Sequence, residues 1–149
     1  MLEKILTTKQ LPVWADQYAQ AVAAAYQPDC IILFGSVARG EQDTDSDIDI
    51  LVIGGELPGD QRSRFRELMR LRPVLAPIQV HAYSRDEWES MMAQQHLTVL
   101  EALHDGQALY GESLFKQWRR RFHEWEEQGL QRTGCSWVVP NTTLHDSMN

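Results

Sequence analysis

The sequence predicts an α/β (α+β) fold in which a small mixed β-sheet is flanked by helices. Short runs of apolar, β-forming residues alternate along the chain with longer segments whose apolar residues recur at helical spacing. The 149 residues fit one domain and suffice to bury a hydrophobic core. The composition, with 43% hydrophobic and 23% charged residues, is ordinary for a globular protein.

Composition and charge exclude several classes of protein. No run approaches the roughly 20 apolar residues of a membrane-spanning helix, and the segment MLEKILTTKQ lacks the apolar core of a signal peptide. The formal net charge of −7 argues against a protein that binds the backbone of a nucleic acid. Nucleotide binding stays open, because a metal ion can supply positive charge. Cys30 and Cys135 form no disulfide framework and fit no zinc spacing, so we expect a cytoplasmic protein.

The first predicted element is a helix that begins at Leu11 and ends before Pro28. Apolar residues recur there at helical spacing, and Pro12 is acceptable in a first turn. The residue before a proline avoids the α region, which places the end of the helix ahead of Pro28. Cys30–Phe34 is a short run of β-forming residues closed by Gly35, which predicts a buried strand.

A polar segment from Gly35 to Ser46 predicts a loop with one helical turn. The alternation over Asp47–Ile53 then predicts a second strand. Its two faces carry different side chains: Ile48, Ile50 and Val52 on one, and Asp47, Asp49 and Leu51 on the other. We expect the first face to be buried and the second to carry carboxylates.

A helix is predicted from about Asp60 to Leu71, before Pro73. Its inward residues are expected to be Phe65, Leu68, Met69 and Leu71. A third strand follows over Ile78–Tyr83, where Ile78, Val80 and Ala82 alternate with Gln79, His81 and Tyr83. Ser84 and Glu87 then form a capping box that opens a helix to about Gln95.

The last third predicts a helix over Leu97–Leu103, a short edge strand over Ala108–Tyr110 and an amphipathic helix over Glu112–Gln128. Five apolar residues line one face of that last helix: Leu114, Phe115, Trp118, Phe122 and Trp125. They fit a core, or, together with Arg119–Arg121, an interface with a partner. The residues after Gly129 show no periodicity, which predicts an irregular tail.

The most informative segment links the first two strands. Gly35 and Ser36 leave a buried strand, and ten residues after the serine Asp47 and Asp49 lie on the next one. Period two puts the two acids on one face, about 7 Å apart. Such carboxylates can share divalent cations, while the Gly-Ser turn presents N–H groups and a hydroxyl to phosphate oxygens. We therefore predict a site for a metal-bound nucleoside triphosphate. Asp43 and Asp45 read as loop residues rather than ligands.

The segment GSVARGEQDTDSDIDILV resembles the signature of the DNA polymerase β nucleotidyltransferase superfamily, and in particular its minimal nucleotidyltransferases. The resemblance is specific from Ile31 to Val52 and extends more loosely to Tyr110–Gly111. It implies the nucleotidyltransferase fold and transfer of a nucleoside monophosphate, AMP from ATP, to an acceptor hydroxyl with two Mg²⁺ or Mn²⁺ ions. Many short members are antitoxins encoded beside HEPN-domain proteins, which implies a HEPN-domain partner.

The resemblance also implies roles for individual residues. Gly35 and Ser36 would bind the nucleotide, and Asp47 and Asp49 would be the catalytic and metal-binding residues. Arg39 would add positive charge to the nucleotide site, or it is a solvated loop residue.

One expected residue is missing. The family supplies a third carboxylate from the strand after the helix, and Gln79 occupies that position here. Glutamine can ligate a metal weakly but cannot accept a proton. His81 lies on the same face and could serve as the base, although an isolated strand histidine is more often structural. Glu87 is better explained as a capping residue.

Three functions fit these observations. The first is an enzyme that transfers AMP to a partner protein, and the second is a binding module that neutralises a partner by contact. The third, transfer to a small molecule, usually needs an added acceptor-binding domain. We expect residues 1–111 to form the nucleotidyltransferase domain, and residues 112–149 to add a helix and tail to it. The oligomeric state stays open, a homo-oligomer included.

Overall fold

The computed structural model describes residues 2–40, 47–73, 75–134 and 136–140, with the side chains of residues 2–11 left out. The predicted loop residues Asp43 and Asp45, together with Cys135 and the tail segment 141–149, lie outside the described residues.

A four-stranded mixed sheet forms the centre of the molecule. Its strands are β1 (Cys30–Phe34), β2 (Ile48–Ile53), β3 (Ile78–Tyr83) and β4 (Gln107–Tyr110), in the order β3-β2-β1-β4. β1 is antiparallel to β2 and β4, whereas β2 and β3 are parallel. The predicted fold class is confirmed, with the β4 segment at one edge of the sheet.

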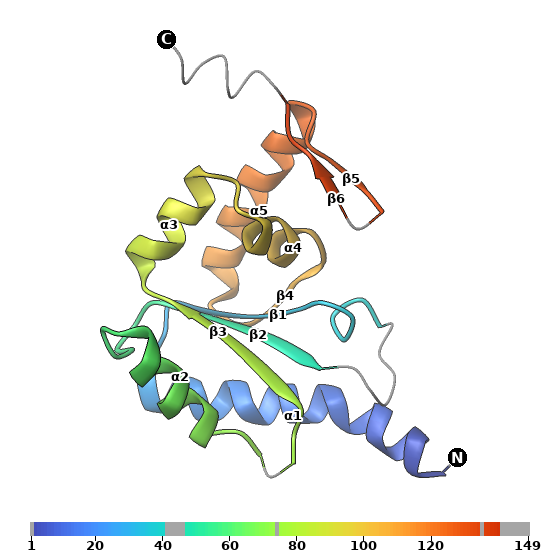
Figure 1. Ribbon diagram of the computed structural model, residues 1–149, viewed down its shortest axis with the longest axis vertical. Coiled ribbons are helices and arrows are strands. Elements are labelled where there is room, and N and C mark those ends of the chain that lie inside the picture. The colour runs from blue at the N-terminus through green and yellow to red at the C-terminus, as the bar shows by residue number, and fades with distance from the viewer. Residues whose placement is uncertain (1, 41–46, 74, 135, 141–149) are drawn as a thin grey trace.

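Helices cover both faces of the sheet (Figure 1). On one face lie α1 (Leu2–Tyr26) and α2 (Gln61–Arg70). On the other lie α3 (Arg85–Ala93), α4 (Leu97–Asp105) and α5 (Glu112–Glu127). None of these helices combines the length and the apolar character needed to cross a membrane.

The two faces of the sheet belong to two separate hydrophobic clusters. Ile48, Ile50 and Val52 pack with α1 and α2, as the alternation predicts. The opposite face of β2 carries the Asp49 carboxylate, as expected, but its other residues, Leu51 and Ile53, are fully buried under α3, α4 and α5. Only the end of that face at Asp49 is left partly exposed.

Two helices differ from their predicted form. α1 begins at Leu2, so Pro12 lies inside the helix rather than in its first turn. The residues ahead of Pro12 are mostly good helix formers, which favours continuation of the helix on its N-terminal side. In α2, Phe65 was expected to face inward but is 54% exposed. The helix instead turns Leu68 and Arg64 into the protein.

Each side-chain nitrogen of the buried arginine of α2 has a hydrogen-bond acceptor. The Arg64 side chain donates hydrogen bonds to the backbone oxygens of Pro58 (2.6 Å) and Gly59 (3.0 Å) and to Glu87 Oε1 (2.7 Å). Glu87 also accepts from the Ser84 backbone N–H, which confirms the predicted capping box. That backbone hydrogen bond, more than the guanidinium of Arg64, lowers the pKa of Glu87 against the opposing effect of burial. Arg64 therefore ties α2 to the start of α3.

The aromatic stripe of α5 belongs to the core. Phe115, Trp118 and Phe122 are all at most 4% exposed, so they offer no free surface to a partner. The segment after Gly129 was predicted to be irregular, and this prediction is wrong for its first part. It forms a hairpin of β5 (Gln131–Thr133) and β6 (Ser136–Val138). Trp137 anchors this hairpin by packing against Phe122 and His104.

We expect Arg64→Met to lower the free energy of unfolding by about 2 kcal/mol, because two backbone carbonyls and Glu87 lose a buried partner. Urea unfolding measures this loss. Arg66→Met, on the exposed side of the same helix, is the matched control and should change stability by less than about 0.5 kcal/mol. Equal effects of the two substitutions would contradict the role given to Arg64.

Candidate functional site

A cleft of about 450 Å³ opens where β1 ends and β2 begins. These two ends are adjacent because the strands are antiparallel, with Phe34 opposite Asp49. The cleft is lined by Phe34, Gly35, Ser36, Arg39, Asp49, Glu101 and Arg132. The structure thus brings together four of the residues singled out in the sequence, namely Gly35, Ser36, Arg39 and Asp49.

Gly35 and Asp49 approach each other so closely that no side chain fits between them. Gly35 has φ +81°, and a Cβ at this position would lie 2.5 Å from Asp49 Oδ2. Glycine satisfies both demands, since it adopts positive φ at little cost and leaves the space to the carboxylate. The Arg39 N–H then donates to the Gly35 carbonyl at 3.2 Å, which forms the predicted helical turn.

Asp49 has a histidine beside it. His81 Nε2 lies 3.6 Å from Asp49 Oδ1, and the imidazole packs 5.4 Å from the Phe34 ring, centroid to centroid. The Nε2 atom is buried and has no hydrogen-bond partner among the described residues. This nitrogen therefore lies beside Asp49 at a distance too long for a hydrogen bond, and His81 itself does not line the cleft.

Asp47 lies in a second depression rather than in the Gly35 cleft. This depression, of about 410 Å³, is also lined by Gln79, Ile78 and Val80 of β3. Gln79 is the partner of Asp49 in the β2–β3 register, so the two depressions adjoin across these strands. The structure therefore groups Asp49 with His81, and Asp47 with Gln79, at one end of the sheet.

A network of charges forms the far wall of the cleft. Asp105 contacts Arg39 (3.4 Å) and Arg132 (2.9 Å). Burial alone would raise the pKa of Asp105, but the hydrogen bond from His104 and the nearby guanidinium groups lower it overall. Glu101 lies 3.5 Å from Arg132 and accepts from Trp137 Nε1. The carboxylates of α4 thus hold the guanidinium groups of Arg39 and Arg132 beside the Gly35–Ser36 turn.

Neither Glu101 nor Arg132 was predicted from the sequence as a site residue. Arg132 comes from the hairpin, in a segment without hydrophobic periodicity. Glu101 lies on a helix whose apolar face accounts for its pattern. Arg132 reaches the cleft through the packing of the hairpin on α4, and Glu101 through the packing of α4 on β1.

The donor atoms of this region fit a Mg²⁺–triphosphate better than a cage made of protein alone. Within the described ranges, no group of three or more histidine, cysteine or acidic side chains comes together as a metal site. Mg²⁺ commonly takes one or two carboxylates and completes its shell with water and substrate phosphates. Asp47 and Asp49 could supply such carboxylates, and the space kept free by Gly35 lies against Asp49.

We expect Gly35→Ala and Gly40→Ala to lower the free energy of unfolding by about 1 kcal/mol each, because both positions have positive φ. Only Gly35→Ala places a methyl group against Asp49, whereas nothing lies within 4 Å of a Cβ at Gly40. The ¹³Cγ chemical shift of Asp49 should therefore change in the first variant alone. An equal change of this chemical shift in both variants would show that Gly35 does not constrain the carboxylate.

Solved structures share this fold at low sequence identity. A chain of a toxin–antitoxin crystallised with AMP-PNP aligns with a TM-score of 0.55 at 17% identity, over 91% of this chain and 98% of that chain. A chain of the tri-AMPylated Shewanella oneidensis HEPN toxin in complex with the MNT antitoxin aligns with a TM-score of 0.52 at 14% identity, over 93% and 99%. No curated protein sequence matches the chain.

The sequence profile of the nucleotidyltransferase domain matches residues 15–129. The match runs from within α1 to the end of α5. It includes every residue that lines the Gly35 cleft and the Asp47 depression, with the exception of Arg132. This chain therefore belongs to the nucleotidyltransferase domain family.

Proposed function

We propose that this protein transfers AMP from ATP to a hydroxyl group of a partner protein in a toxin–antitoxin setting. The observation that carries the proposal is the contact of Asp49 with the Gly35 turn, inside a chain of the nucleotidyltransferase family. The fold shared with one toxin–antitoxin crystallised with AMP-PNP supports ATP as the substrate. The fold shared with a complex of an AMPylated HEPN toxin and an MNT antitoxin supports a HEPN-domain partner.

In this proposal the Gly35–Ser36 turn binds the triphosphate. The backbone N–H groups of the turn and the Ser36 hydroxyl donate to phosphate oxygens. Arg39 and Arg132 line the same cleft and stabilise the negative charge of the leaving pyrophosphate. Their ion pairs with Asp105 hold the two guanidinium groups in position before the nucleotide binds.

Asp47 and Asp49 would hold the Mg²⁺ or Mn²⁺ ions. When bound, these ions neutralise phosphate charge and make the acceptor hydroxyl more acidic. The acceptor oxygen attacks the α-phosphorus, the bond to the pyrophosphate breaks, and the hydroxyl proton leaves. In this proposal the proton goes to His81 Nε2, which lies 3.6 Å from Asp49 Oδ1, because the Gln79 amide cannot accept it.

A second function is favoured by Gln79. In this alternative, the neutral amide at the position of the family's third carboxylate makes the chain a weak catalyst, and it acts on its partner by contact. Under either function we propose a cytoplasmic protein in which residues 1–111 form the nucleotidyltransferase domain. α5 and the hairpin then extend this domain.

Calorimetric titration tests the nucleotide site directly. We expect ATP to bind with Mg²⁺ and much more weakly without it, and Asp47→Ala/Asp49→Ala to abolish the Mg²⁺-dependent binding. Asp16→Ala/Asp86→Ala removes two exposed acids from α1 and α3 and should bind as the wild type does. If the wild type binds no ATP with Mg²⁺, the proposed nucleotide site is wrong.

Gln79→Asp should raise the rate of transfer by at least about tenfold, because it adds a proton acceptor and a metal ligand beside Asp49. Pyrophosphate release from Mg-ATP, with N-acetyltyrosinamide as the hydroxyl acceptor, measures the rate. Gln79→Asn, which stays neutral, is the control. An inert wild type that gains nothing from Gln79→Asp would favour the contact-only function.

A further inference from the structure

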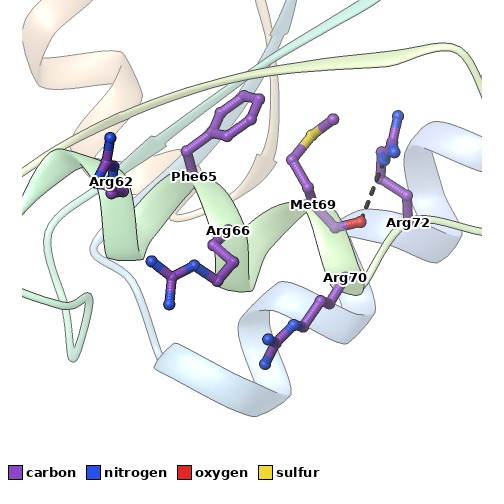
Figure 2. A pocket seen from close by; sticks show the side chains of 6 residues that line it. All are labelled: Arg62, Phe65, Arg66, Met69, Arg70 and Arg72. Atoms are coloured by element: carbon purple, nitrogen blue, oxygen red, sulfur yellow. Dashed lines mark hydrogen bonds between the residues drawn. The ribbon is translucent and has the colours of Figure 1, made fainter.

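A groove of about 650 Å³ runs along the outer face of α2, apart from the Gly35 cleft. It is lined by Arg62, Phe65, Arg66, Met69, Arg70 and Arg72. In Figure 2, Phe65 and Met69 project from one edge of the helix, while Arg66 and Arg70 project from the other. We refer to these six residues as the α2 groove.

The arginines of the α2 groove form no close ion pair with a described acidic residue, although Asp60 interacts with Arg66 at longer range. Within the described part of the chain, no carboxylate lies within 4 Å of Arg62, Arg66, Arg70 or Arg72, although Arg72 donates to the Met69 backbone oxygen. Other arginines do have such partners: Arg85, Arg121 and Arg132 each contact one or more acids. Four guanidinium groups without a close ion pair, on a chain of formal charge −7, are a local concentration of positive charge.

The groove also has an apolar wall. Phe65 is 54% exposed, and Met69 is half-buried beside it. Exposed apolar side chains that lie together and are bordered by charges are typical of binding surfaces.

The groove leads to the proposed catalytic end of the sheet. Phe65, Met69 and Arg72 line both the α2 groove and the depression that contains Asp47 and Gln79. A chain segment seated on α2 could therefore continue over β3 to Asp47 without crossing another element.

We propose that the α2 groove binds an acidic segment of the polypeptide that carries the acceptor hydroxyl. Arg62, Arg66 and Arg70 lie on successive turns and span about 12 Å along the helix, which matches a few acidic residues of a partner. Phe65 and Met69 take an apolar side chain of the same segment. The inference rests on the proposed transfer to a protein, and it assigns the surface by which that protein is recognised.

A polypeptide fits this surface better than a nucleic acid does. A long polyanion would extend beyond the four arginines onto a molecule that is negatively charged overall. Single-stranded nucleic acids are bound by aromatic side chains on which successive bases stack. The two depressions offer one aromatic ring, Phe65, among Met69 and the aliphatic side chains of β3.

Binding of a random glutamate–tyrosine copolymer to the full chain tests the proposal. It supplies carboxylates and phenolic hydroxyls, and fluorescence anisotropy of the labelled copolymer at low salt, without nucleotide, measures the dissociation constant. We expect Arg62→Gln/Arg66→Gln to weaken binding about tenfold. Lys116→Gln/Arg120→Gln removes two exposed charges from α5 and should bind within twofold of the wild type. Thermal unfolding checks that all variants fold.

Three outcomes would overturn the proposal. The wild type could fail to bind the copolymer, or both double variants could bind it equally. A uridine 20-mer could also bind more tightly than the copolymer through Arg62 and Arg66, which would assign the groove to a nucleic acid. Because no nucleotide is present, the outcome is independent of the ATP titration. If the protein binds ATP with Mg²⁺ but Arg62→Gln/Arg66→Gln does not weaken copolymer binding, this inference is refuted and the proposed function is not.

Discussion

The close contact between the Gly35 backbone and the Asp49 carboxylate is the constraint on which the rest of the site depends. It exists because β1 and β2 are antiparallel and Phe34 lies opposite Asp49. The glycine turn at the end of one strand then meets the acid at the start of the other. Two buried strands hold these backbones in place, so the position of the carboxylate is set by the core and not by a flexible loop.

The helices decide which part of the sheet is open to a ligand. α1 and α2 cover one face, and α3, α4 and α5 cover most of the other. On that second face the exposed region is the end where Asp49, His81 and Gln79 lie side by side on β2 and β3. Asp105 of α4 and Arg132 of the hairpin add charge at its margin. The site is thus built by local sequence at the strands and by long-range packing around them.

The strands and the carboxylate motif could be predicted from the sequence because they depend on local patterns. Period-two alternation identified β2 and β3, and the run Cys30–Phe34 identified β1. The capping box at Ser84 is equally local. What these patterns predict about roles at the site, for Asp47 and Asp49 above all, stays a prediction.

The remaining features depend on contacts that a local pattern does not contain. Arg64 was not predicted to be buried, because its partners at Pro58, Gly59 and Glu87 come together only when α2 packs beside α3. Phe65 was expected inside because it is large and apolar, yet the arginine takes the inward direction. Arg132 reaches the cleft through a hairpin that Trp137 fixes to α4 and α5, far from the motif in sequence.

The connection from β2 through α2 to β3 is a β-α-β unit, since it joins two neighbouring parallel strands. Residues 48–83 therefore contain the α2 groove, Asp49, Gln79 and His81 on one continuous stretch of chain. Leu68 and Arg64 fix the inner side of α2, while the outer side makes no contribution to the core. The outer residues of α2 can therefore be substituted without disturbing the core or the strand ends that carry Asp49, Gln79 and His81.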